Sequence, residues 1–383
     1  MKIKWSYDLP TTEFSNDYHY ESPILVKGND LFFILTSPSP ALHIIDVKTG
    51  CLREIIPCIG NSLIPSRCFF VDYKDTVIFY TGELWAYDGK KISRILDLSQ
   101  EKEINSHILQ GNRLLLCGRS RLFCLNLDTL SAEWELNIEN STQYRTGDIS
   151  IFEETVACFG QDKLLFIDLD NGSIRGSIKI PRIAKLYCPI RAEDNTLLLG
   201  YTNWSNAGIL KYAECARQVL WKSKRSFEGP QLKCKIYAFD NFVCWVKNGR
   251  ELICHNSENG EEIYRTATSP WLYTDLFFND GNIIFGTSGS DGYIFSINAQ
   301  NGEENWSLFL KNGCAYYDMY NDSIIVGDFS KRIHLIDASS GRIIKTLATD
   351  GEVVGQIKVH GKYAYTVIWG NENAPIRLIK IQL

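Results

Sequence analysis

Histidines are the residues of this chain most suited to holding a metal or moving a proton. Six occur in 383 residues, at positions 19, 43, 107, 255, 334 and 360, each in a separate segment. A metal site needs three or four converging ligands, and no segment supplies even two of these histidines. His43 and His334 each follow the first residue of an apolar stretch. We therefore expect them to point outward from a strand as structural or surface residues, and we expect no metal site.

Two short motifs resemble catalytic or metal-binding signatures but lack a required residue. In the segment GTSGSDG, residues 286–292, Ser290 stands where a G-x-S-x-G nucleophile motif needs its last glycine, and no strand-to-helix turn is expected there. The segment DLDNG, residues 168–172, misplaces the glycine of an EF-hand loop and omits its distal Glu. The first motif is therefore interpreted as a strand connection and the second as a turn.

The elements that would position any functional residue are extended. Residues 294–308, IFSINAQNGEENWSL, contain two segments with alternating side chains around an Asn-Gly pair. This pattern predicts a β-hairpin, because glycine adopts the positive φ that such a turn requires. Trp306 follows the turn and offers a large surface for burial between sheets.

The hairpin recurs along nearly the whole chain. Copies begin at Leu42, Leu84, Leu122, Leu164, Ile209, Leu252, Ile294 and Ile333. Four residues after each start, seven of the eight copies carry Asp or Asn, which can accept hydrogen bonds from the turn. Five copies place glycine eight residues after the start, at Gly50, Gly172, Gly260, Gly302 and Gly341. Four residues beyond this position, four copies carry an aromatic residue: Trp134, Trp221, Tyr264 and Trp306.

Two further apolar segments precede each hairpin, which makes a unit of four antiparallel strands and about 42 residues. This is typical of a β-propeller blade, so we predict an all-β fold. Eight complete units and one shared by the two ends of the chain give nine blades. Eight blades are the alternative, if residues 182–223 are absorbed into neighbouring units.

The predicted ninth blade takes three strands from residues 353–383, namely 353–359, 363–369 and 376–382. Residues 1–9 supply its outer strand, in which Lys2 to Asp8 pair with Ile376 to Gln382. Such pairing would close the propeller and cover sheet edges that invite aggregation. We therefore predict that residues 1–383 form a single domain.

The repeated residues resemble the D-x-x-x-G-x-x-x-W motif of the PQQ-like propeller superfamily, which includes quinoprotein and BamB-like members. The segments that carry the resemblance are Asp46 to Gly50, Asp168 to Gly172, Asn298 to Trp306 and Asp337 to Gly341. The superfamily implies a β-propeller that serves either as a PQQ-dependent alcohol dehydrogenase or as a non-enzymatic protein-binding scaffold. The dehydrogenases characteristically carry adjacent cysteines and a calcium site with a catalytic Asp. This sequence has no Cys-Cys pair, so we expect no PQQ or other cofactor and assign no catalytic residue.

Composition limits the classes of partner. The net charge of −5 provides no general attraction to nucleic acid or to an anionic membrane. The start MKIKWSYDLP has no apolar run of signal-peptide length, and we expect a cytoplasmic monomer. Most of the twelve cysteines, including Cys117, Cys124, Cys158, Cys244 and Cys254, stand in apolar strand patterns and are predicted to be buried and reduced.

We place the candidate binding residues in the loops that enter the innermost strands. These loops form one face of a propeller, and their residues do not follow the repeated pattern, so they are free to carry function. They are rich in Tyr, Trp and Arg, which dominate protein-binding hot spots. The set is Tyr20, Glu21, Arg67, Tyr144, Arg145, Tyr187, Lys233, Trp271, Tyr273, Tyr316 and Gln356. We predict a non-catalytic scaffold that binds a protein partner through this face, although packing roles for these residues stay open.

The alternative function is an enzyme or a binder of a small ligand, such as a sugar or a planar cofactor, that uses the central channel. The polar groups for this alternative would be Glu21, Arg67, Asp275 and Asp318.

Overall fold

The computed structural model describes 21 segments of the chain. They are residues 1–10, 23–35, 40–57, 68–96, 98, 101, 104–138, 149–160, 163–179, 185–192, 196–202, 206–213, 217–223, 225–226, 236–239, 241–247, 249–267, 272, 274, 276–370 and 375–383. These segments contain strands and turns and no helix. They form two compact units, of which unit 1 joins Met1–Ser93 with Thr268–Leu383 and unit 2 is Arg94–Ala267. The prediction of a single domain stays a prediction.

Unit 1 begins with two four-stranded antiparallel sheets. Blade 1 consists of β2 (Ile24–Lys27), β3 (Asp30–Leu35), β4 (Ala41–Asp46) and β5 (Leu52–Pro57). Blade 2 consists of β6 (Phe69–Tyr73), β7 (Thr76–Tyr80), β8 (Leu84–Tyr87) and β9 (Ile92–Leu96).

Unit 2 contains four more blades. Blade 3 consists of β10 (Ile104–Gln110), β11 (Arg113–Gly118), β12 (Arg121–Asn126) and β13 (Ser131–Asn137), and blade 4 of β14 (Ser150–Phe152), β15 (Thr155–Gly160), β16 (Lys163–Asp168) and β17 (Ile174–Ile178). Blade 5 consists of β18 (Lys185–Arg191), β19 (Thr196–Thr202), β20 (Asn206–Ala213) and β21 (Gln218–Lys222), with β22 (Arg225–Ser226) paired to β20. Blade 6 consists of β23 (Ile236–Phe239), β24 (Phe242–Lys247), β25 (Glu251–Asn256) and β26 (Glu262–Ala267). Blade 5 is a sheet of its own, so the alternative that absorbs residues 182–223 into its neighbours is wrong.

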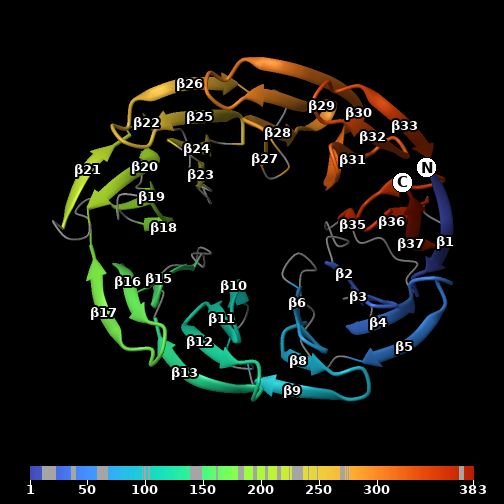
Figure 1. The fold of residues 1–383 in the computed structure, drawn as a ribbon, viewed down its shortest axis with the longest axis horizontal. Coiled ribbons are helices and arrows are strands. Elements are labelled where there is room, and N and C mark those ends of the chain that lie inside the picture. The colour runs from blue at the N-terminus through green and yellow to red at the C-terminus, as the bar shows by residue number, and fades with distance from the viewer. Residues whose placement is uncertain are drawn as a thin grey trace. The chain divides into compact units, whose positions relative to one another are not determined.

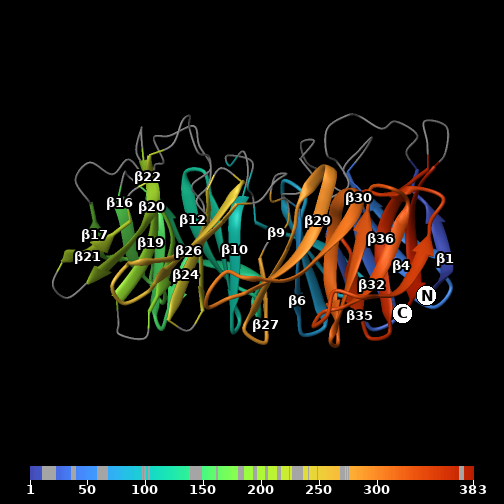
Figure 2. The same cartoon turned by 90° about the horizontal axis from the view of Figure 1, so that it is seen from above.

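Blades 7 and 8, in unit 1, share one long strand. Their strands are β27 (Phe277–Asn279), β28 (Asn282–Gly286), β29 (Ser288–Asn298), β30 (Glu304–Tyr320), β31 (Ser323–Asp328), β32 (Arg332–Asp337) and β33 (Ile343–Ala348). Up to Gly313, β30 pairs with β29 as the outer strand of blade 7, and from Cys314 it pairs with β31 as the innermost strand of blade 8. Figure 2 shows β29 and β30 side by side in orange.

Both ends of the chain contribute to blade 9, which consists of β34 (Glu352–Val353), β35 (Lys358–His360), β36 (Tyr363–Trp369), β37 (Ile376–Gln382) and β1 (Lys2–Asp8). β1, in blue, pairs antiparallel with β37, in red (Figure 1), from Lys2 opposite Gln382 to Asp8 opposite Arg377. The predicted pairing of the two ends is confirmed. The described strands thus form a nine-bladed β-propeller of four-stranded antiparallel blades, as the repeat count predicted.

The innermost strand of blade 9 differs from the prediction, because residues 353–359 are not one strand. β34 and β35 pair separately with β36 and are interrupted at 354–357. The amides of Val354 and Gly355 both donate to the carbonyl of Val367, and the Thr366 hydroxyl donates to the carbonyl of Gly355. These bonds satisfy the backbone at the interruption.

The repeated turn residues act as the sequence predicted. Gly50, Gly172, Gly260, Gly302 and Gly341 all have φ between 69° and 76°. At each turn the preceding Asp or Asn accepts backbone hydrogen bonds; the Asn298 Oδ1, for example, accepts from the amides of Gln300 and Asn301. Hydrogen bonds from Ser339 and Ser340 lower the pKa of Asp337 to about 2.

Four tryptophans dock the outer strand of one blade onto the turn of the next. The indole Nε1 donates to a backbone carbonyl in each case: Trp5 to Val47 (2.9 Å), Trp134 to Leu169 (2.9 Å), Trp221 to Ser257 (3.3 Å) and Trp306 to Ala338 (3.0 Å). The ring lies so close to the turn glycine that an added Cβ would meet it at 2.5 to 2.7 Å, at Gly50, Gly172, Gly260 and Gly341 respectively. Only glycine provides both the positive φ and this close approach.

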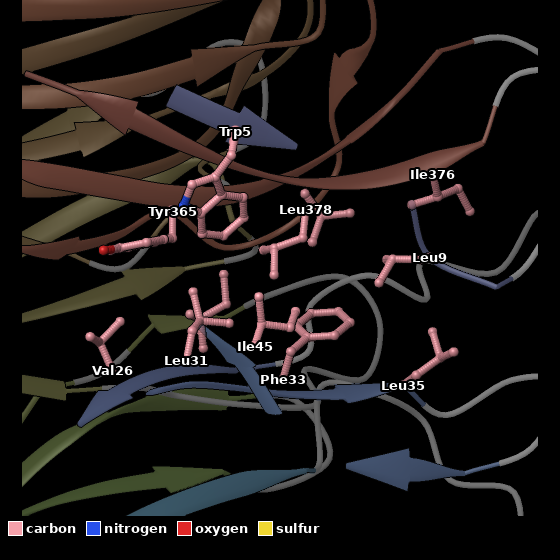
Figure 3. Packing of buried hydrophobic residues seen from close by; sticks show 12 residues of the cluster. Trp5, Leu9, Val26, Leu31, Phe33, Leu35, Ile45, Tyr365, Ile376 and Leu378 are labelled. Atoms are coloured by element: carbon pink, nitrogen blue, oxygen red, sulfur yellow. The ribbon is translucent and has the colours of Figure 1, made fainter. Parts of the chain in front are cut away.

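Apolar side chains from facing sheets fill the space between neighbouring blades. Between blades 9 and 1, Trp5 and Tyr365 pack with aliphatic residues from both sheets (Figure 3). This cluster includes Leu31, Phe33 and Leu378, each at most 1% exposed. Burial of such a side chain stabilises the fold by roughly 1.5–3 kcal/mol.

Candidate functional site

Most of the predicted binding residues lie outside the described residues. These are Tyr20, Glu21, Arg67, Tyr144, Arg145, Lys233, Trp271 and Tyr273. The backbone of Tyr187 belongs to β18, and its side chain is not among those described. The role of these nine residues in binding stays a prediction.

Tyr316 and Gln356 are the two members of the set with described side chains, and both belong to unit 1. Tyr316 lies in β30 opposite Gly327 of β31 and is half-buried. Its ring packs against the core cluster that contains Ile325 and Val353, so part of its surface is used in packing. Gln356 lies between β34 and β35 and is exposed, so its amide is open to a partner.

Asp318 belongs to the alternative set of channel residues. Its Oδ2 accepts a 2.7 Å hydrogen bond from the amide of Val359, and its Oδ1 accepts a 2.8 Å bond from the amide of Met319. The carboxylate therefore fastens β30 to β35. Of the other members of that set, Glu21, Arg67 and Asp275 lie outside the described residues.

A buried polar network in blade 8 was not predicted from the sequence. Asp328, 1% exposed, accepts hydrogen bonds from the amides of Ser330 (2.9 Å) and Arg332 (3.0 Å). Its Oδ2 also lies 3.3 Å from Nε2 of His334, while Nδ1 of His334 lies 3.0 Å from the Thr346 hydroxyl. Burial raises the pKa of Asp328, but the hydrogen bonds from His334 and Ser330 outweigh it and lower that pKa overall.

This network has the residue types of a proton relay. Because two of the bonds to Asp328 come from amides of the β31–β32 turn, the carboxylate also fixes the conformation of that turn. We interpret the network as structural. The spacing of Asp328 and His334 across a short turn was the signal in the sequence that would have indicated the pair.

His43, at the equivalent repeat position in β4, has a different partner. Its Nδ1 lies 3.0 Å from the hydroxyl of Tyr7 in β1, and burial lowers the pKa of His43 to about 4. His43 is 1% exposed and His334 is 5% exposed, so the expectation that these histidines point outward is wrong. His43 lies between apolar residues of β4 and contacts Tyr7 of blade 9. His334 lies between apolar residues of β32 and contacts Asp328 and Thr346 of its own blade.

Glu101 is a second buried carboxylate, in unit 2. It accepts hydrogen bonds from the amides of Arg119 (2.9 Å) and Ser120 (3.1 Å), from the Ser120 hydroxyl and from Arg121 Nε. All these donors belong to the β11–β12 turn or its end. Glu101 therefore satisfies the hydrogen-bond donors of this turn, as Asp328 does in blade 8.

The five cysteines predicted to be buried are all buried and free. Burial raises the pKa of the Cys124 thiol to about 12, with a contribution from nearby Glu133, and burial alone raises that of Cys158 to about 12. Thiols with such a raised pKa stay protonated and are poor nucleophiles.

The described residues contain neither a cluster of metal ligands nor a membrane-spanning helix. Within them, no group of three or more His, Cys, Asp and Glu side chains is arranged to hold a metal ion. In the same part of the chain, there is no helix with the length and apolarity that a membrane crossing requires.

Four-stranded blades with an Asp- or Asn-capped glycine turn and a docked tryptophan are features that this chain shares with PQQ-like β-propellers. The sequence pattern of the family described as outer membrane protein assembly factor BamB matches residues 206–368, which is less than half of the chain. No curated protein matches the sequence. The predicted resemblance to the PQQ-like superfamily is confirmed by the family match and by solved structures.

Three solved structures illustrate the fold. BamB from Moraxella catarrhalis has 15% sequence identity and a TM-score of 0.52, and the match covers 100% of this chain and 97% of that protein. A quinohemoprotein alcohol dehydrogenase from Comamonas testosteroni has 12% identity and a TM-score of 0.56, covering 99% of this chain and 76% of that protein. A europium-containing methanol dehydrogenase has 7% identity and a TM-score of 0.54, covering 100% and 93%. At these identities the likeness extends to the fold alone.

Proposed function

We propose that this chain is a non-catalytic scaffold that binds a protein partner through the loops entering its innermost strands. The observation that carries the proposal is that the repeated polar and aromatic residues all have structural roles. The turn Asp and Asn side chains cap backbone amides, and the docking tryptophans hold neighbouring blades together. The repeat thereby supplies a frame, and specificity is left to residues that do not repeat.

The named relatives favour a protein as the partner. The matched family is described as an assembly factor, and BamB from Moraxella catarrhalis spans the same length as this chain. The Tyr, Trp and Arg content of the candidate face is typical of protein-binding hot spots. Exposed Gln356 is a polar contact on that face, whereas Tyr316 contributes the part of its ring that packing leaves open.

The quinoprotein neighbours raise the question of a PQQ cofactor, and we propose that this chain holds none. The sequence has no adjacent cysteines. The described cysteines of the apolar strands are buried in the sheets, and the Asp318 carboxylate is occupied by two backbone amides. We therefore assign the chain no quinone chemistry.

The test compares two sets of substitutions. Tyr144→Ala, Arg145→Ala and Trp271→Ala together should abolish recovery of the partner in quantitative affinity purification, with the melting temperature unchanged. The control carries Lys90→Ala, Lys91→Ala and Leu109→Ala, which change exposed residues away from the candidate face. Equal recovery by both variants would reject the candidate face.

The alternative is an enzyme or small-ligand binder that uses the central channel. A thermal-shift screen with quinones, sugars, nucleotides and divalent metals tests it, because a ligand of the native state raises the melting temperature. A reproducible shift that Asp275→Asn removes would favour the alternative over the scaffold. We also propose that the protein is a cytoplasmic monomer. Size-exclusion chromatography with light scattering tests the monomer, and fractionation of cells that express the chain tests the location.

A further inference from the structure

Blade 9 carries a group of lysines on its outer strand β1, on β37 and in the β35–β36 turn. We call this group the lysine patch: Lys2, Lys4, Lys362 and Lys380. β1 is the outermost strand of this sheet, as Figure 1 shows, and it pairs on one side with β37. Lys2 and Lys4 on β1 are exposed, as is Lys362 in the turn between β35 and β36. Lys380 on β37 is buried at 4% exposure beneath them.

The register of the strands brings these lysines together around Tyr363. Lys2 lies opposite Gln382, and Gln382 lies opposite Tyr363 on the other side of β37. The register shifts between Ile3 and Trp5, so that Lys4 occupies a β-bulge. The Nζ of Lys380 lies 3.8 Å from the centroid of the Tyr363 ring, and that of Lys362 lies 5.8 Å from the same centroid.

The lysine patch differs from the arginines of the described blades in its lack of neutralising acids, and in blade 9 itself Arg377 pairs with Asp350. On blades 1, 3 and 6, arginines pair with acids: Arg53 with Asp30 at 2.8 Å, Arg113 with Glu133 at 2.8 Å and Arg265 with Glu262 at 2.9 Å. Within the described residues, no member of the lysine patch has such an ion pair.

Mutual repulsion within the patch is consistent with this excess charge. Loss of solvation lowers the pKa of Lys4, and the proximity of Lys2 and Lys362 lowers it further. Burial lowers the pKa of Lys380, which Lys4 and Lys362 lower further and Asp46 opposes. The Asp46 carboxylate, however, is already hydrogen-bonded by Arg53 and by the amides of its own turn.

We propose that the lysine patch binds an acidic segment of a protein partner through the carboxylates of that segment. Exposed Lys2, Lys4 and Lys362 supply three ammonium groups near one another, while buried Lys380 adds positive charge beside them and donates to the carbonyl of Val47. The bulge at Lys4 interrupts the regular edge of β1, so the patch suits side-chain carboxylates better than an added strand. A net charge of −5 opposes long polyanions such as nucleic acid, whereas a short acidic segment meets only the local positive charge.

This surface is separate from the candidate face in the proposed function. It contains none of the eleven residues predicted for that face. Its lysines lie on β1, on β37 and in the β35–β36 turn rather than in loops that enter innermost strands. Substitutions in the patch and substitutions of Tyr144, Arg145 and Trp271 therefore test different claims, and either can fail without the other.

The experiment measures fluorescence anisotropy of a short labelled peptide with Glu at every second position, with a Gln-substituted peptide as the reference. The test variant carries Lys2→Gln, Lys4→Gln and Lys362→Gln and leaves buried Lys380 unchanged. The control variant carries Lys90→Gln, Lys91→Gln and Lys311→Gln, which remove the same charge from exposed sites in unit 1. We expect the test variant to bind about tenfold more weakly or worse, because it loses the ammonium groups that would pair with three carboxylates of the peptide.

Several outcomes would overturn the proposal. Unchanged binding of the peptide by the test variant would overturn it. An equal loss of peptide affinity in the control variant would also overturn it, because that result would indicate a response to net charge alone. Displacement of the peptide by equimolar inorganic phosphate would indicate a site for a small oxyanion. Tighter binding of vesicles with anionic lipid, or of an oligonucleotide, would also contradict an acidic protein segment. Equal melting temperatures of both variants and the parent exclude unfolding as the cause.

Discussion

In blades 7 and 9, the outer strand carries a tryptophan that contacts the turn of the next blade, but the two strands are connected differently to the rest of the chain. In blade 7, Trp306 donates to the carbonyl of Ala338 and packs on Gly341. In blade 9, Trp5 donates to the carbonyl of Val47 and packs on Gly50. The strand that carries Trp306 continues covalently into blade 8, whereas the strand that carries Trp5 comes from the opposite end of the chain. The contact is therefore the same, but only in blade 9 does it hold a strand from the other end of the chain, together with the β1–β37 pairing.

Blade 9 has reinforcements that compensate for the missing covalent connection. The carbonyl of Val47 accepts a second hydrogen bond, at 2.7 Å, from the buried Lys380 ammonium. Tyr7 of β1 contacts His43 of blade 1 through both a hydrogen bond and an edge-on ring contact. Residues from β1, β37 and blade 1 thus hold the end of the chain in place, and the following predictions test how much each contributes.

Removal of residues 1–8 should have the largest effect. It deletes the whole of β1, exposes the edge of β37 and removes Trp5 and Tyr7 from the core at roughly 1.5–3 kcal/mol per large side chain. We expect a sharp fall in the melting temperature by differential scanning calorimetry. The control, Lys2→Gln with Lys4→Gln, keeps the strand and should melt near the parent. An unchanged melting curve for the deletion would contradict closure of the propeller by β1.

The two tryptophans should differ in dynamics more than in stability. Trp5→Ala and Trp306→Ala each leave a cavity and should lower the free energy of unfolding by about 3–5 kcal/mol in chemical denaturation. Hydrogen exchange should separate them, because Trp5→Ala releases a strand that has no covalent link to its sheet. We expect faster amide exchange throughout β1 in Trp5→Ala. In Trp306→Ala the β29–β30 ladder should keep its protection, and equal loss of protection in both variants would remove the distinction.

The blades were predictable because their determinants are local and repeated. Asn298, Gly302 and Trp306 lie within nine residues of one another, so one hairpin reveals the turn, the cap and the dock. The pairing of β1 with β37 was also predictable, because the last unit lacked one strand and the first residues had one to spare. In these elements, spacing along the sequence translates directly into contact.

The candidate site was less predictable because its determinants are not periodic. Asp318 had the chemistry of a channel residue, yet an amide 41 positions away, on Val359, accounts for one of its oxygens. His43 and His334 occupy the same repeat position, but one faces a phenol and the other a carboxylate. These partners lie in another strand or another blade and do not recur from one repeat to the next. The repeated pattern therefore does not predict which residue each side chain contacts.

The turn glycines allow the dock to be disrupted without changing the tryptophan. Gly341→Ala should lower the free energy of unfolding by roughly 2–4 kcal/mol, because a positive φ costs alanine about 1–2 kcal/mol and the new Cβ meets Trp306 at 2.5 Å. Gly281→Ala is the matched control, with φ of 75° and open space around the Cβ. Urea titration should show the smaller loss for the control, and equal losses would mean that strain rather than ring contact requires glycine at 341.

The smallest effect concerns pH and the contact between blade 9 and blade 1. His43 has a folded pKa of about 4 and an unfolded pKa of about 6.5, so between these values the unfolded state binds more protons. The stability from burying neutral imidazole is therefore complete above pH 6.5 and falls as pH drops toward 4, by up to about 1.4 kcal/mol for each pH unit within that window. His43→Gln removes this titration, and the difference in unfolding free energy between parent and variant should shrink across that window. A difference that does not depend on pH would mean that burial between β1 and blade 1 does not hold the His43 imidazole neutral.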